Sequence, residues 1–101
     1  MPMTMEEYLA KHPVEQEQVE AHKRRMLTEV RGHRLRELRE NAGLTQEQLA
    51  KRIGVGHRQV SRIERGDLEY VRIGTLRDYV QATGAELAVE HAMGDVRTRI
   101  A

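Results

Sequence analysis

Residues 44–66 read LTQEQLAKRIGVGHRQVSRIERG, and this stretch decides the fold of the chain. It predicts two short helices joined by a tight turn. Thr45 and Gln48 have the spacing of a capping box at the start of the first helix. Gly54 lies where the chain reverses, because a positive φ is cheap only for glycine. The second helix begins near His57, and Gly66 occupies the usual position after a helix C-terminus.

The apolar residues of these two helices recur at helical spacing, so each helix has an inward face. Leu49 and Ile53 form that face in the first helix, and Val60 and Ile63 form it in the second. Ala50 is small where the second helix must cross the first closely. The pattern therefore predicts a packed helix-turn-helix.

The outward face of the second helix carries mainly hydrogen-bond donors. They are His57, Arg58, Ser61, Arg62 and Arg65. An arginine can form two hydrogen bonds with O6 and N7 of guanine, so this face suits the edge of a DNA major groove. A basic helix is usually only a solvated surface, but this one follows a capped helix and a glycine turn. We therefore expect it to bind DNA.

Residues 35–66 resemble the Cro/C1-type (XRE) helix-turn-helix family, whose signature is GLTQxxLA…VS…IExG. The chain matches it at Gly43-Leu-Thr-Gln, Leu49-Ala50, Val60-Ser61 and Ile63-Glu64-Arg65-Gly66. The resemblance implies a mainly α, five-helix, lambda-repressor-like domain. To this domain we expect the chain to add an N-terminal helical extension and a C-terminal β-hairpin.

The resemblance also implies which residues contact DNA, and it places Gln46 against a backbone phosphate. The implied DNA-binding set is Thr45, Gln46, Gly56, His57, Arg58, Gln59, Ser61, Arg62 and Arg65. The family often has Ser or Thr where Gly56 stands; glycine caps a helix nearly as well but offers no hydroxyl. Members often pair an arginine late in the first helix with a glutamate of the recognition helix. The matching residues here are Arg39 and Glu64.

Composition limits the class of protein. The 101 residues include no Trp, Phe or Cys and only three Tyr, so one small domain with an aliphatic core is expected. The absence of cysteine excludes a disulfide, a thiolate zinc site and a cysteine nucleophile. No apolar run approaches membrane length and the N-terminus does not resemble a signal peptide, so we expect a cytoplasmic protein without membrane contact.

The residues give little support to catalysis. Ser61 is the only serine and has no acid–histidine pair at a suitable spacing, and the five histidines show no paired ligand spacing. Because aromatic side chains that could stack on bases are scarce, RNA binding is disfavoured as well. We expect no enzyme activity, no catalytic residue, no metal and no cofactor.

The charge of the chain is unevenly distributed, although its net charge is only +1. Residues 1–20 contain one lysine against five glutamates, whereas residues 31–65 contain nine basic residues against four acidic ones. Positive charge therefore gathers on the segment expected to bind DNA, where a local field steers association.

Three segments are expected along the chain. Residues 1–31 form an acidic, helical extension: a short helix capped by Thr4 and Glu7 and ended by Pro13, then a second helix from Val14 to about Arg31. Gly32 interrupts the apolar pattern, which leaves open one kinked helix or two. Residues 32–84 form the helix-turn-helix domain, with a last helix capped by Thr75 and running to about Thr83.

Residues 85–101 change to strand spacing. Apolar and polar residues alternate from Leu87 to Met93 and again from Val96 to Ile100, around a turn at Gly94-Asp95. Because a lone two-stranded hairpin is marginal in water, it needs a partner surface. We expect a homodimer through Leu87, Val89 and His91 that binds a palindromic operator in double-stranded DNA. The alternative is that the hairpin folds back on its own helices.

The short length, the helical extension and the β-tail resemble HigA-type antitoxins of type II toxin–antitoxin pairs. That resemblance implies a repressor that neutralises a small basic ribonuclease toxin and represses its own operon. The acidic extension would bind the toxin by charge complementarity, unless it only packs on the core. The alternative function is a stand-alone or phage-type regulator without a toxin. A coactivator that no longer binds DNA is disfavoured by the intact arginine face.

Overall fold

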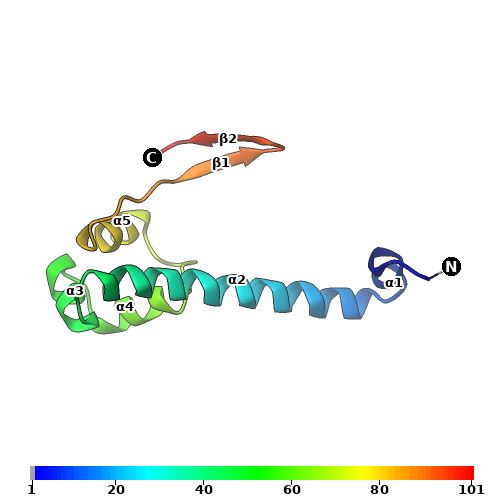
Figure 1. Ribbon diagram of the computed structural model, residues 1–101, viewed down its shortest axis with the longest axis horizontal. Coiled ribbons are helices and arrows are strands. Elements are labelled where there is room, and N and C mark those ends of the chain that lie inside the picture. Colours follow the sequence, from blue (N-terminus) through cyan, green and yellow to red (C-terminus); the bar gives the residue numbers. More distant parts are fainter. Residues whose placement is uncertain (1) are drawn as a thin grey trace.

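The computed structural model describes residues 2–101 and shows a mainly helical chain that ends in a β-hairpin, as expected. Its elements are α1 (Met5–Lys11), α2 (Pro13–Asn41), α3 (Gln46–Ile53), α4 (His57–Glu64), α5 (Ile73–Ala82), β1 (Glu90–Met93) and β2 (Val96–Arg99). Figure 1 shows α3, α4 and α5 gathered around the C-terminal half of α2, whose other half projects as a rod. Within residues 2–101, no helix is both long and apolar enough to cross a membrane.

The α3–turn–α4 unit forms as the sequence predicts. The Thr45 hydroxyl accepts a hydrogen bond from the Gln48 backbone N–H at 3.1 Å, and the Gln48 side chain accepts one from the Thr45 N–H at 2.9 Å. Gly54 ends α3 at φ 75°, a left-handed conformation that glycine adopts without a steric penalty. Leu49, Val60 and Ile63 are fully buried, so both helices turn their apolar faces into one core.

The structure decides between the two alternatives left open at Gly32, because α2 is one helix of 29 residues that passes through it. Gly32 is buried against the end of α4 instead. A Cβ atom at Gly32 would collide with the Glu64 carbonyl oxygen and lie 2.6 Å from the Gly66 nitrogen. A Cβ at Gly66, which has φ 78°, would collide with the Thr28 carbonyl oxygen. The two glycines therefore let α2 and α4 approach backbone to backbone.

The N-terminal extension is helical but lies almost entirely in solvent. Thr4 caps α1 by accepting a hydrogen bond from the Glu7 N–H at 3.1 Å. Pro13 opens α2 within its first turn, where its missing N–H costs nothing. The buried residues of α2 are Gly32 and Arg39, both in the half that packs on the other helices. α2 is thus one continuous helix, whose C-terminal half packs on the other helices and whose N-terminal half is free.

The last helix begins earlier than expected, and Thr75 is not its cap. α5 starts at Ile73, and the Leu76 N–H already donates to the Arg72 carbonyl at 3.0 Å. Thr75 therefore lies inside the first turn, where its hydroxyl is no longer at the cap position. Tyr79 and Val80 of this helix are buried in the core.

The C-terminal hairpin forms with its turn at Gly94-Asp95, but it is shorter than the alternation predicts. Register pairs Glu90 with Arg99 and Met93 with Val96. Leu87 precedes the strands and is partly buried against the core instead of belonging to β1. All residues of β1 and β2 are exposed. Within this chain the hairpin therefore has no covered face.

Substituting Gly32 with Ala should destabilise the fold, because the added Cβ collides with backbone that cannot rotate away. We expect the free energy of unfolding in urea to fall by about 1–3 kcal/mol or more. Gly74→Ala is the matched control, since it makes the same change in a helix where the new Cβ meets only the end of Arg77, 3.8 Å away. The control should be neutral or slightly stabilising; a G32A chain as stable as the parent would contradict the close approach.

Candidate nucleic-acid interface

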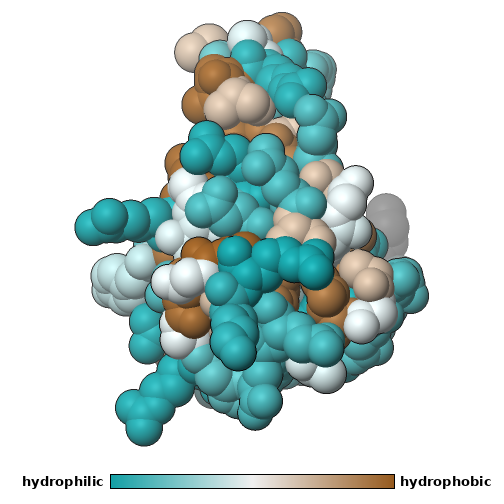
Figure 2. Space-filling view, turned by 90° about the vertical axis from the view of Figure 1, so that its left-hand side faces the viewer, coloured by the Kyte–Doolittle hydropathy of each residue, from teal (hydrophilic) through white to brown (hydrophobic). Residues whose placement is uncertain are grey.

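The outer face of α4 is free of the core. Val60 and Ile63 anchor the helix on its inner side with no exposed surface. On the other side His57, Arg58, Arg62 and Arg65 are exposed. In Figure 2, which views the α3 and α4 end of the molecule, hydrophilic residues cover most of the lower part of the surface. The arrangement leaves a row of three long arginine side chains, with His57 beside them, available to a ligand.

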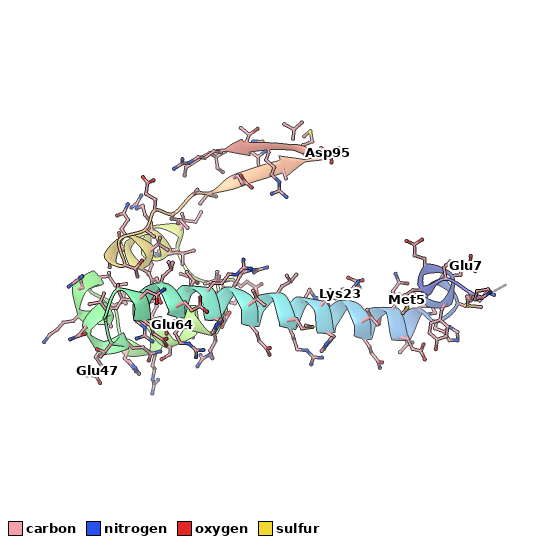
Figure 3. All side chains as sticks on the ribbon, in the orientation of Figure 1. Met5, Glu7, Lys23, Glu47, Glu64 and Asp95 are labelled. Carbon is pink, nitrogen blue, oxygen red and sulfur yellow. The ribbon has the colours of Figure 1, made fainter. Side chains whose placement is uncertain are left out.

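The angle of α4 is held by a buried ion pair between Arg39 and Glu64. Arg39 donates from Nε to Glu64 Oε2 at 2.8 Å and from Nη2 to Oε1 at 2.9 Å, and each residue is only 8% exposed. Arg39 also donates from Nη1 to the Leu44 carbonyl at 2.7 Å, just before α3 begins. The expected pairing is thus present, and it joins α2, α4 and the loop before α3. Figure 3 shows Glu64 where α2 and α4 cross, in contrast to Glu47, which projects from the surface.

Tyr79 also belongs to this hydrogen-bond network. The sequence pattern did not indicate it as a site residue. Its hydroxyl lies 2.9 Å from Glu64 Oε2 and 3.0 Å from the Leu35 carbonyl oxygen, while its ring is fully buried. The signal in the sequence was a tyrosine within an apolar helical stripe, because a buried hydroxyl must find a polar partner. Among residues 2–101, every buried side-chain nitrogen and oxygen has a hydrogen-bond partner.

These contacts set the protonation states of the network. Burial acts to raise the pKa of Glu64, but hydrogen bonds from Arg39, Gln46 and Tyr79 outweigh it and the pKa is lowered. Burial, and then the hydrogen bond to Glu64, raise the pKa of Tyr79. Because the pKa of Glu64 lies below its ordinary value of 4.5 in the folded protein, its contribution to stability is complete above that pH. That contribution is lost as the pH falls through the folded-state pKa.

Gln46, at the start of α3, forms hydrogen bonds with two residues of α4. Its Nε2 donates to Glu64 Oε1 at 3.2 Å, and its Oε1 accepts a hydrogen bond from the Ser61 hydroxyl at 3.3 Å. Ser61, expected on the DNA-facing side, is therefore half-buried and already engaged with Gln46. These two hydrogen bonds orient the amide of Gln46 at the start of α3.

The other predicted site residues lie around this centre. Thr45 caps α3, and Gly56 caps α4 in an extended conformation without a side-chain hydrogen bond. Gln59 is half-buried on α4, and Arg62 lies 3.8 Å from a carboxylate oxygen of Asp67 in an exposed ion pair. The residues expected at a dimer contact lie elsewhere. Leu87, Val89 and His91 belong to the C-terminal segment, on the far side of α5 from α4 in Figure 1.

Comparison with known proteins agrees with this geometry. Residues 32–92 match the family described as "Helix-turn-helix domain". The chain is 45% identical over 95 residues to "Putative antitoxin HigA2" of Mycobacterium tuberculosis (strain ATCC 25618 / H37Rv), and the match covers 94% of each chain. The chain belongs to the HigA-type antitoxins of the helix-turn-helix family.

Two further relatives place this HigA-type antitoxin among similar proteins. "Putative antitoxin HigA3" of the same organism is 38% identical over 47 residues, which cover 46% of this chain and 43% of that protein. A solved structure described as "Induced DNA bending by unique dimerization of HigA antitoxin" is 34% identical, with a TM-score of 0.55. The match covers 63% of this chain and 83% of the other.

Removing one partner of the buried pair should destabilise this HigA-type antitoxin strongly. Arg39→Ala leaves the Glu64 carboxylate buried without its counter-charge, so we expect a loss of about 3–5 kcal/mol and an earlier thermal transition. Arg36→Ala on the same helix is the control, because its side chain is 47% exposed and its ion pair with Glu40 at 3.5 Å contributes at most about 1 kcal/mol. Equal melting temperatures for the two variants would contradict a stabilising role for the buried Arg39–Glu64 pair.

Proposed function

We propose that the chain is a sequence-specific DNA-binding repressor that binds a palindromic operator as a homodimer and acts as the antitoxin of a basic ribonuclease toxin. The observation that carries the DNA-binding part is the free cationic face of α4, opposite the fully buried Val60 and Ile63. This face has the donor chemistry of a recognition helix in the major groove. The HigA relatives support the antitoxin part.

In this proposal the residues of the site make two kinds of contact with DNA. Arg58 and Arg62 reach base edges, where a guanidinium can discriminate guanine by two hydrogen bonds. Gln46 contacts a backbone phosphate with an amide that Ser61 and Glu64 hold in place. Base contacts specify the sequence, whereas phosphate contacts position the protein on any duplex.

The homodimer would form through the C-terminal segment around Leu87, Val89 and His91. β1 and β2 are exposed on both faces, and Met93, Val96 and Ile100 are 80%, 66% and 64% exposed. In Figure 2 hydrophobic residues lie among hydrophilic ones in the upper part of the molecule, where the C-terminal segment lies. A second copy would cover apolar surface that water now contacts, and the solved HigA relative is described by its dimerization. Sedimentation of a monomer at micromolar concentration would contradict this.

Alanine substitutions should separate the two kinds of DNA contact. Arg58→Ala and Arg62→Ala should each weaken binding to the duplex upstream of the chain's own operon by about 1–3 kcal/mol and relax its sequence preference. Gln46→Ala should weaken binding to operator and mixed-sequence duplexes about equally. Arg34→Ala, on α2, is the control for loss of one exposed charge. Fluorescence anisotropy at fixed salt measures all four; unchanged operator preference in both α4 variants would contradict base contact.

The toxin partner is proposed to bind the acidic extension. The five glutamates of residues 1–20 are all exposed on α1 and the free half of α2. Replacing Glu15, Glu17 and Glu20 with Gln should reduce capture of the co-expressed neighbouring toxin, because charge complementarity is lost. Three exposed glutamates elsewhere form the matched control when replaced with Gln: Glu47, Glu69 and Glu86. Equal capture by both triple variants would exclude this segment as the main contact.

A further inference from the structure

A groove of about 460 Å³ lies beside the crossing of α2 and the end of α4. Most of the residues that line it are outside the predicted DNA-binding set. We call it the seam groove. Three arginines line it, Arg25 and Arg36 from α2 and Arg65 at the end of α4, together with His33 of α2. Glu29 and Glu64 also line it, but the Glu64 carboxylate is occupied by Arg39. The groove therefore has an excess of positive charge.

The seam groove is continuous with the proposed DNA-binding face. Arg65 both lines the groove and belongs to the outer row of α4. A second hollow of about 570 Å³ follows α2 toward its C-terminus, and Gln46 and His57 are among its lining residues. Arg25, Arg36 and Glu40, which line the two hollows, share one face of α2 by helical spacing. That face of α2 thus runs along the same side of the molecule as the expected phosphate contact.

The cations of the seam groove are available to a ligand. In the part of the chain that the structure describes, neither Arg25 nor Arg65 forms an ion pair, and both are exposed. Arg36 lies 3.5 Å from Glu40 and 3.0 Å from His33 Nδ1, yet half of its side chain stays in solvent. Exposed pairs of this kind exchange readily for a stronger anionic partner.

We propose that the seam groove binds the backbone phosphates of duplex DNA next to the site of α4, so that α2 extends the DNA interface beyond the helix-turn-helix. The inference rests on the proposed DNA-binding function. A recognition helix lies between two phosphate backbones, and the groove sits at the C-terminal end of α4, where one of them must pass. Arginines are suited to phosphate oxygens by their planar, forked donors.

Binding of a mixed-sequence duplex across a salt series tests this, because phosphate contacts need no particular sequence. The plot of log K against log salt has a negative slope, and Arg25→Gln and Arg36→Gln should each reduce its magnitude by about 1. The loss of affinity should be equal on operator and mixed-sequence duplexes. Arg34→Gln is the matched control, since Arg34 lies about 180° around α2 from Arg25 and removes the same charge from the opposite face. The control should keep a slope close to that of the parent chain.

The outcomes separate the inference from the function on which it rests. Equal effects of Arg25→Gln and Arg34→Gln would show only a long-range charge effect and would overturn the groove as a site. Reduced capture of the toxin with unchanged DNA binding would overturn it too, and would assign the groove to the protein partner. Failure of the parent chain to bind any duplex would instead overturn the proposed DNA-binding function. The three exposed positions permit these changes without disturbing the core, which the thermal transition of each variant verifies.

Discussion

The buried ion pair between Arg39 and Glu64 is the constraint on which the helix arrangement depends. It joins α2 to α4, and Tyr79 and Gln46 attach α5 and α3 to the same carboxylate. Burying two charges is unfavourable unless geometry and hydrogen bonding compensate. Here each carboxylate oxygen has two hydrogen-bond partners, and Arg39 donates three hydrogen bonds, two to Glu64 and one to the Leu44 carbonyl. Such a network stabilises one packing of four helices more than it stabilises any single helix.

The network also determines what the outer surface can do. Because Glu64 and its apolar neighbours fix the inner side of α4, the arginines of the outer side project from a rigid element. Gln46 is tied to the same carboxylate, so the expected phosphate contact and the expected base contacts are held in one frame. Positioned groups lose less entropy on binding than mobile ones. The interior chemistry of the domain therefore supports recognition at its surface.

The long helix α2 carries different charges along its length. α1 and the first two turns of α2 present five exposed glutamates, while Arg25 and Arg36 further along α2 line the seam groove. Gly32 and Gly66 make this possible, since they let α2 pass α4 at backbone contact without breaking. One uninterrupted helix thus carries exposed glutamates near its N-terminus and the arginines of the seam groove nearer its crossing with α4.

The sequence by itself determined the elements whose causes are local. The capping box of Thr45 and Gln48, the left-handed Gly54 and the inward faces of α3 and α4 depend on residues a few positions apart, and resemblance to the family indicated the Arg39–Glu64 pair. Only the tertiary structure decided that Gly32 is a packing site and not a break, that α5 starts before Thr75, that Leu87 joins the core, and that Tyr79 binds Glu64. Those features arise between segments distant along the chain. Spacing within one helix shows which residues face inward, but it does not show which partner they meet.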